Sequence, residues 1–163
     1  MRDYYRINDP PLGVGAYGEV RQCVYKENIL DKKSSLKQLR AVKIMSKAYM
    51  EEREMISFKN EIDCLKTMNH PHIVKLHHYF EDPKRYLIVT DLVSGGELFD
   101  MIRTEKKIDH LKAAGIIKQI LSAVKYMHKH LYVHRDLKME NILLQDKESE
   151  LPSIKLIDFG TTR

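Results

Sequence analysis

Two short acidic motifs near the end of the chain carry its clearest chemistry. Residues 134–141 read HRDLKMEN and residues 158–160 read DFG. We expect Asp136 to accept or orient a proton from an incoming hydroxyl, and Asn141, on the strand that follows, to offer its amide oxygen to Mg²⁺. Asp158 is a hard oxygen ligand that would link this metal to nucleotide phosphates. Each residue alone has an ordinary structural explanation, but their joint order indicates phosphate-transfer chemistry.

Two lysines could supply positive charge to such phosphates. Lys138 lies two positions after Asp136 and can neutralise charge on a phosphoryl group during its transfer. Lys43 interrupts an apolar strand expected at 41–44, and an inward-facing ammonium needs an anionic partner because its unpaired burial is costly. The helix that follows places Glu61 on its apolar side. We therefore expect a Lys43–Glu61 ion pair, although Lys43 considered alone could extend to solvent.

A glycine-rich segment near the start suits a second role, the close approach of backbone to phosphate. Residues 13–20 follow the pattern G-x-G-x-x-G with Gly13, Gly15 and Gly18, whose missing side chains let N–H groups approach a polyphosphate. A dinucleotide-binding fold would need a helix here, yet residues 20–25 favour a strand. The segment therefore predicts a hairpin over phosphates, with a ligand-free glycine turn as the alternative.

The remaining pattern predicts strands and one helix in the first half and helices in the second. Residues 25–38 are polar and read as an insertion between two strands, and residues 86–89 read as a buried strand. Glycines within 90–96 interrupt regular structure and indicate a hinge. The segment 111–127 has the apolar stripe of an amphipathic helix that packs on a core. This stripe comprises Ala113, Ile117, Ile120, Leu121, Val124 and Met127.

Composition excludes several classes of protein. The net charge of +5 is spread along 163 residues, which does not favour nucleic-acid binding. Cys23 and Cys64 have no neighbouring cysteine and no secretory leader opens the chain, so we expect an intracellular protein with reduced thiols. No apolar run approaches the roughly 20 residues that span a bilayer. Four histidines between 70 and 78 could suggest a zinc site. No cysteine lies at the spacing of a zinc finger, so we do not expect one.

Taken together, these motifs resemble a eukaryotic protein kinase domain, collinear from about residue 5 to the end of the chain. The sequence segments 69–76, 95–100 and 126–128 resemble those of the calcium/calmodulin-regulated group of kinases. Within this group the chain is most similar to the calcium-dependent protein kinases of protists and plants. The resemblance implies an α+β, two-lobed fold. Residues 1–90 would form an antiparallel sheet with one helix, residues 91–95 a hinge, and residues 96–163 an incomplete helical lobe.

The resemblance also implies ATP and Mg²⁺ as cofactors and assigns residues to them. Thr90 falls at the gatekeeper position, and residues 91–93 form the hinge that contacts adenine. The carboxylates of Glu97 and Glu140 match positions that pair with substrate arginines, which implies Ser or Thr acceptors near basic residues. The nucleotide-contacting set is Leu12, Gly13, Gly15, Gly18, Val20, Ala41, Lys43, Thr90, Asp91, Val93 and Leu143. The catalytic set is Lys43, Glu61, Asp136 and Lys138, with Asn141 and Asp158 for the metal.

The implied function is transfer of the ATP γ-phosphate to Ser or Thr hydroxyls of proteins. Lys138 after HRDL is the serine/threonine pattern, and a calcium-sensing segment would lie outside this chain. Three departures remove no ligand: Arg40 replaces an apolar residue, Met139 replaces a proline, and two threonines follow the DFG motif. Two alternatives remain, an inactive truncated kinase or pseudokinase that only binds nucleotide or protein, and a small-molecule kinase of related fold. Without further lobe segments, apolar helix faces would lie in water and favour aggregation.

Overall fold

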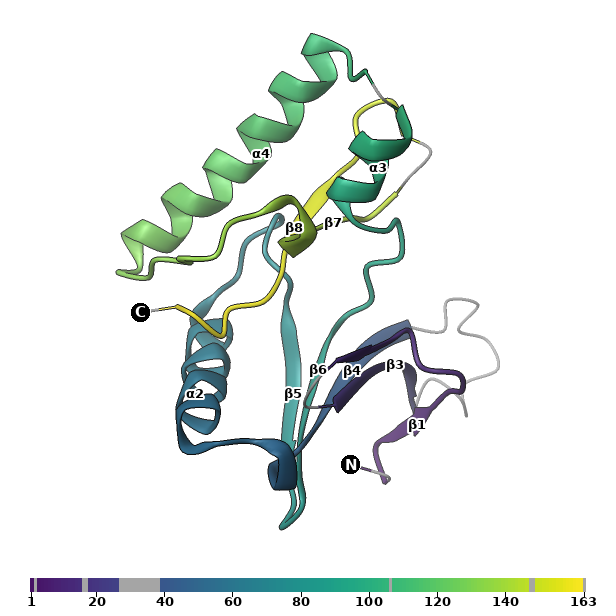
Figure 1. The fold of residues 1–163 in the computed structure, drawn as a ribbon, viewed down its shortest axis with the longest axis vertical. Helices are drawn as coiled ribbons and strands as arrows, with labels where there is room; N and C mark the ends of the chain where they lie inside the picture. The colour runs from purple at the N-terminus through teal and green to yellow at the C-terminus, as the bar shows by residue number, and fades with distance from the viewer. Residues whose placement is uncertain (2, 16–17, 27–38, 106, 147–148, 163) are drawn as a thin grey trace. The chain divides into compact units, whose positions relative to one another are not determined.

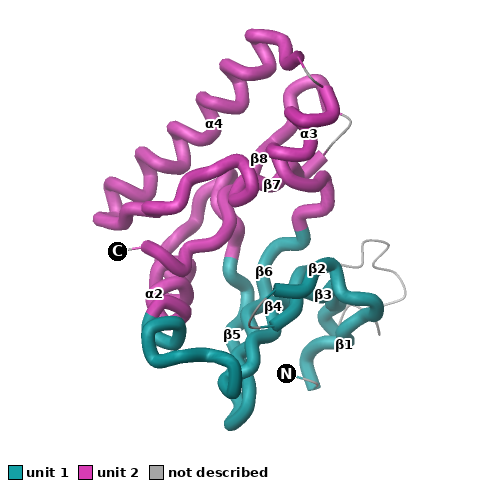
Figure 2. Tube along the Cα trace, in the orientation of Figure 1, with its two compact units in different colours: residues 1–56, 76–92 teal, residues 57–75, 93–163 magenta. Residues whose placement is uncertain are grey.

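The computed structural model describes residues 1, 3–15, 18–26, 39–105, 107–146 and 149–162. Most of the predicted insertion at 25–38, two residues of the glycine-rich segment and the final arginine lie outside these ranges. The described residues form two compact units (Figure 2). The first comprises 1–56 and 76–92, and the second comprises 57–75 and 93–163.

The first unit is built on an antiparallel sheet (Figure 1). Its strand order is β1-β3-β4-β6-β5, and β2 pairs with β3 as a hairpin. The strands are β1 (Tyr5–Ile7), β2 (Gly13–Gly15), β3 (Gly18–Tyr25), β4 (Leu39–Ser46), β5 (Leu76–Glu81) and β6 (Arg85–Asp91), and a 3-10 turn η1 (Lys47–Tyr49) follows β4. The strands predicted at 20–25, 41–44 and 86–89 are confirmed, and the last continues to Asp91, because the chain keeps its pairing with β4 to that point.

One face of this sheet carries a hydrophobic core. Side chains alternate between the faces of a strand, so residues directly paired across strands share a face. The core on this face comprises Tyr5, Cys23, Val42, Leu87 and Val89. Burial raises the pKa of the Cys23 thiol to about 11, which keeps it protonated.

Helix α2 (Glu52–Thr67) crosses from the first unit into the second. Its first turn carries Glu52 and Glu54, whose charges favour a helix N-terminus. The apolar side of this helix predicts an inward face of Met55, Phe58, Ile62 and Leu65, which is confirmed at the last three, whereas Met55 is only half-buried. Glu61 is buried with them, with 6% of its surface exposed.

The second unit combines helices with a short two-stranded sheet (Figure 1). Its elements after α2 are α3 (Leu98–Glu105), α4 (His110–Lys129), a 3-10 turn η2 (Met139–Asn141), β7 (Ile142–Leu144) and β8 (Ile154–Leu156). Asp109 caps α4, because its Oδ2 accepts from the N–H of Leu111 at 2.8 Å and of Lys112 at 3.3 Å. Among the described residues, no helix is both long and apolar enough to cross a membrane.

Helix α4 buries part of the predicted stripe: Met127 is buried and Ala113, Ile120 and Val124 are half-buried. Ile116, Ala123 and Met127 are buried, whereas Ile117 is 53% exposed and Leu121 is 61% exposed. The prediction of a single stripe was wrong at Ile117 and Leu121, because apolar residues cover two adjacent sides of this helix and only one packs in the unit. The exposure of the second side agrees with the expectation that apolar helix surface lies in water.

We predict that Leu121→Glu reduces self-association of the chain without unfolding it. The substitution removes exposed apolar surface, worth about 25 cal/mol per Å², and it should change the free energy of unfolding by less than about 0.5 kcal/mol. Ala123→Glu is the matched control on the buried side, and an unpaired buried carboxylate there should cost about 3 kcal/mol or more. Sedimentation velocity at rising concentration and urea unfolding measure both effects. Equal destabilisation by the two variants would contradict the assigned helix face.

Candidate functional site

The sheet of the first unit collects four predicted nucleotide residues on one face. Val20 pairs with Lys43, and Ala41 pairs with Thr90. Ala41 and Lys43 are two residues apart in β4, so all four lie on the same side of the sheet. This side is opposite the core that contains Val42. The face presents a small apolar surface beside one ammonium, which suits a planar base joined to phosphates.

The three glycines of the predicted phosphate loop differ in their surroundings. A Cβ built on Gly18 would lie 1.9 Å from the carbonyl oxygen of Ile44, so the packing of β3 on β4 requires glycine there. A Cβ on Gly13 would have no neighbour within 4 Å, and one on Gly15 would meet only the Gly18 oxygen at 3.9 Å. The backbone at Gly13 and Gly15 is therefore open to the approach of a ligand. Leu12, just before them, is exposed and donates its N–H to the Val20 carbonyl at 2.7 Å.

The predicted hinge follows the last residue of β6. Asp91 is still in the strand, and residues 92–96 have no regular structure. Gly96 has a φ of 85°, a conformation that favours glycine. After this segment, Glu97 forms an antiparallel bridge with Leu143. In the second unit the backbone of Glu97 is thus paired with that of the predicted adenine contact Leu143.

Residues 136–141 of the second unit bring three predicted site residues into direct contact. The Nδ2 of Asn141 donates to the Asp136 backbone oxygen and to the Asp136 Oδ2, both at 2.9 Å. The Lys138 Nζ lies 2.9 Å from the same Oδ2. Asn141 is the last residue of η2, and the prediction that it lies on a strand was wrong. The 3-10 turn closes through a bond from the Asn141 N–H to the Lys138 oxygen at 3.0 Å, which returns the amide to Asp136.

These contacts set the charge state of the segment. The bond from Lys138 is the largest cause that lowers the pKa of Asp136 below its ordinary value of 3.8, and Asn141 lowers it further. The same bond raises the pKa of Lys138, and Asp158 contributes to that rise through its charge. Asp136 is therefore ionised and Lys138 protonated at neutral pH, with a second carboxylate close enough to interact.

A buried histidine holds the two acidic motifs. The ring of His134 is 2% exposed and lies 5.0 Å from the ring of Phe159, centroid to centroid. Its Nδ1 accepts the N–H of Asp136 at 3.3 Å, so its Nε2–H donates to the Ile157 carbonyl at 3.1 Å. Phe159 is thus packed in the core beside His134, with none of its surface exposed. Asp158, one residue after Ile157, has a φ of 60° and an exposed side chain.

Two contacts to the second motif carried no signal in the sequence. The hydroxyl of Ser57 on α2 donates to the carbonyl of Gly160, and the hydroxyl of Thr161 donates to the carbonyl of His134 at 2.8 Å. A single serine within an amphipathic helix is common. The threonine after the DFG motif could only be read as a departure from the usual residue.

The predicted Lys43–Glu61 ion pair joins residues of different units and stays a prediction. Lys43 is half-buried in β4, and Glu61 is buried on α2.

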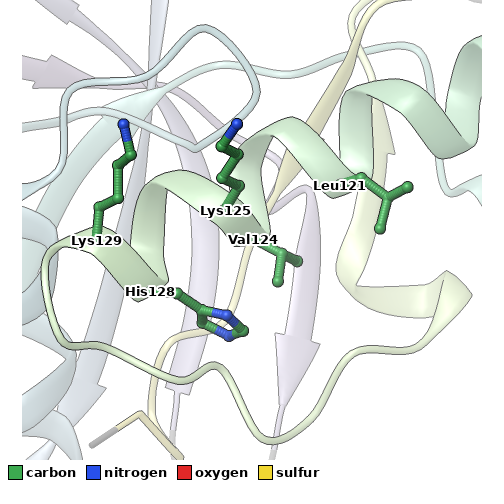
Figure 3. A pocket seen from close by; sticks show the side chains of 5 residues that line it. All are labelled: Leu121, Val124, Lys125, His128 and Lys129. Carbon is green, nitrogen blue, oxygen red and sulfur yellow. The ribbon is translucent and has the colours of Figure 1, made fainter.

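A separate hollow of about 500 Å³ lies on α4 and contains no predicted site residue. Leu121, Val124, Lys125, His128 and Lys129 line it. Figure 3 shows that all five come from one helix, with the two lysines extending in one direction and Val124 and His128 in the other. The hollow lies along the exposed apolar side of the helix rather than beside the acidic motifs.

Comparison with known proteins identifies the family. The protein kinase domain family matches residues 7–163, and the chain belongs to this family. Its α+β, two-lobed kinase fold is thereby confirmed. The resemblance to calcium-dependent protein kinases is also confirmed by the named relatives.

Three relatives show the range of similarity. The chain is 45% identical over 150 residues to calcium-dependent protein kinase 4 of Plasmodium berghei (strain Anka), covering 91% of this chain and 27% of the relative. It is 42% identical over 160 residues to calcium-dependent protein kinase 3 of Plasmodium yoelii yoelii, covering 98% and 28%. It is 36% identical over 160 residues to NUAK family SNF1-like kinase 1 of Homo sapiens, covering 98% and 22%. The chain therefore spans about a quarter of the length of these relatives.

We predict that Lys138→Met raises the pKa of Asp136 towards 3.8, because the lysine bond is the main cause of its depression. Carboxyl NMR titration measures the shift. With a depressed folded-state pKa, the ionised form contributes stability above about pH 3.8 that is lost as the pH falls through the folded-state value. Lys138→Met should reduce this contribution. Lys129→Met, the same charge change on α4, should leave the Asp136 titration unchanged, and an equal shift in both variants would argue for a general charge effect.

Proposed function

We propose that this chain binds ATP with Mg²⁺ and that the protein containing it transfers the γ-phosphate to Ser or Thr hydroxyls of proteins. The single observation that carries the proposal is the cluster of Asp136, Lys138 and Asn141 with the charge of Asp158 nearby. The cluster offers an ionised proton acceptor, a cation and oxygen ligands within one short segment. The family and the calcium-dependent kinases among the relatives support it.

The first unit would hold the base and the phosphates. Val20, Ala41 and Thr90 offer apolar contact to adenine on the sheet face that also carries Lys43. The residues after Thr90, from Asp91 to Val93, would bond the edge of the base, and Leu143 of the second unit would contact its other side. The open backbone at Gly13 and Gly15 would bond phosphate oxygens. Lys43, for which we propose an ion pair with Glu61, would neutralise phosphate charge.

The second unit would hold the metal. The Nδ2 of Asn141 is bonded to Asp136, which leaves the amide oxygen on the opposite side of the group as a ligand. Asp158 supplies a carboxylate from an exposed position. Within the described ranges, no three His, Cys, Asp or Glu side chains gather as a metal site. A magnesium ion held here would therefore take its remaining ligands from phosphates and water, as this ion commonly does.

The acceptor hydroxyl would be oriented by Asp136, whose depressed pKa keeps it ionised and able to accept a hydrogen bond. Lys138 would stabilise negative charge on the phosphoryl group during transfer. The metal supplies electrostatic stabilisation when bound. Catalysis of this kind depends on positioning and charge rather than on a covalent intermediate.

The same family match supports a proposal for the substrate and the regulation. Glu140 is exposed and Glu97 is half-buried, and their carboxylates would pair with arginines upstream of the acceptor residue. The relatives are named calcium-dependent, so a calcium-sensing segment outside this chain is part of the proposal. We further propose the lobe boundaries at 1–90, 91–95 and 96–163.

A second function is nucleotide or protein binding without turnover. It is the alternative that the phosphate-transfer assay below is designed to separate from turnover. All the residues assigned to the metal and to the phosphates are nevertheless present.

We predict that the chain binds Mg·ATP and that Lys43→Met weakens this binding about tenfold, through loss of a cation beside the phosphates. Lys118→Met, an exposed lysine on α4, is the control and should bind as wild type. Asp158→Asn should remove most of the dependence on Mg²⁺, which titrations with and without EDTA measure. Isothermal titration calorimetry gives all three values. Absence of heat from Mg·ATP added to folded wild-type chain would refute the proposed nucleotide binding.

We predict that Asp136→Asn lowers phosphate transfer to a basic serine peptide by about 10²–10⁴-fold while ATP affinity stays near wild type. The assay follows labelled γ-phosphate and uses the chain alone and a chimaera extended by the segment that follows the match in a Plasmodium relative. Asp63→Asn removes an exposed carboxylate on α2 and should leave transfer unchanged. ATP binding without transfer in both wild-type forms would favour the binding function, whereas full transfer by Asp136→Asn would show that another group acts as base.

A further inference from the structure

Three polar side chains from three neighbouring strands meet where the sheet of the first unit leads into the hinge. Arg40 comes from β4, His77 from β5 and Asp91 from β6. β6 lies between the other two strands, and Arg40 pairs directly with Asp91. The three side chains are 17–26% exposed, so most of their surface is removed from water.

The contacts between them converge on one carboxylate oxygen. The Nε2 of His77 lies 2.7 Å from the Asp91 Oδ1, and the Nη1 of Arg40 lies 3.9 Å from the same oxygen. Arg40 Nη1 also contacts His77 Nε2. A carboxylate only accepts hydrogen bonds, so the contact with Asp91 needs a proton on Nε2, whereas a guanidinium only donates, so the contact with Arg40 needs Nε2 to accept; the imidazole makes one of these two bonds at a time. Arg40 and His77 thus both approach one oxygen of Asp91 and also contact each other.

A strand irregularity makes the histidine contact possible. Leu76 pairs with Thr90 and His78 pairs with Val89, so His77 is an extra residue in β5. Val89 and Asp91 share a face of β6, and His78 lies on that face by its pairing. In a regular strand His77 would point to the other face. The bulge turns it towards Asp91, which is the kind of redirection that bulges provide.

The cluster is poorly explained as a device for stability. It lies on the face of the sheet that carries the core of Val42 and Val89, at a position where Arg40 replaces an apolar residue of the family pattern. Desolvated charges cost free energy, and apolar replacements of such groups are often neutral or stabilising. The cluster instead fixes the orientation of Asp91. This residue is the last one in β6 before the irregular segment 92–96.

We infer that Arg40 and His77 are positioning residues that fix Asp91 and, through it, the backbone of the hinge that bonds adenine. This inference rests on the proposed function and assigns two further residues to its nucleotide site. The hinge groups that bond adenine are backbone groups, and their direction depends on how the strand end is held. The Asp91 carbonyl is also restrained by the Thr90 hydroxyl, which donates to it at 3.2 Å. A substitution that shifts these backbone groups weakens ligand binding even though the substituted side chain does not contact the ligand.

The test uses adenosine, which would reach the hinge but not the phosphate-binding residues, beside Mg·ATP. We expect Arg40→Val and His77→Phe to weaken the binding of both ligands about three- to tenfold. His77→Gln, whose amide can donate to Asp91, should recover most of the affinity. Lys43→Met should weaken Mg·ATP but not adenosine. Glu81→Gln removes the ion pair with Lys47 elsewhere in the same sheet and should bind both ligands as wild type.

Calorimetry gives the affinities, and thermal unfolding of each variant separates a structural role from a positioning role. If Arg40→Val and His77→Phe unfold at lower temperature yet bind adenosine within twofold of wild type, the cluster is structural and the inference is overturned while the proposed nucleotide binding stands. If Arg40→Val does not fold, the comparison of adenosine affinity between His77→Phe and His77→Gln tests the inference, and equal affinities would overturn it. If wild type binds neither ligand, the proposed function and this inference both fail.

Discussion

The buried imidazole of His134 is bonded at both ring nitrogens, and each bond reaches a different acidic motif. One nitrogen accepts the N–H of Asp136, and the other donates to the carbonyl of Ile157, directly before Asp158. Phe159 packs against the same ring. The positions of Asp136, the proposed proton acceptor, and of Asp158, the proposed metal ligand, therefore depend on one side chain that is almost completely buried. Asn141 and Lys138, from the turn that follows, then orient the Asp136 carboxylate and favour its ionised form.

The register of the sheet is the second constraint on the proposed function. Pairing of Val20 with Lys43 and of Ala41 with Thr90 places residues from three strands on one face. The close approach of β4 requires glycine at Gly18, whereas the space at Gly13 and Gly15 remains open. One glycine of the motif is thus explained by packing, and two are available to a ligand. The same register brings Arg40 opposite Asp91 on the other face, so one strand pairing sets both the residues proposed to contact the base and those proposed to support the hinge.

Most elements and the members of the site could be predicted because their signals are local. The strand around Lys43, the buried side of α2 and the break after Asp91 follow from periodicity and glycine placement. Asn141 was predicted on a strand because Ile142–Leu144 begins directly after it, but a 3-10 turn ends at that residue. The exposed Ile117 and Leu121 were assigned to the packed stripe because helical periodicity marks apolar residues without showing which of two apolar sides has a partner.

The order and spacing of the two acidic motifs, the glycine-rich segment and the lysine strand were sufficient by themselves to determine the family, because these residues have chemical requirements that few other arrangements meet. Their contacts were decided only by tertiary structure. The bond from His134 to Ile157 joins positions 23 residues apart. The bulge that turns His77 towards Asp91 depends on the pairing of β5 with β6. Sequence pattern reports which face of an element a residue occupies, whereas strand register, bulges and turn closure are set by neighbours that are distant in the chain.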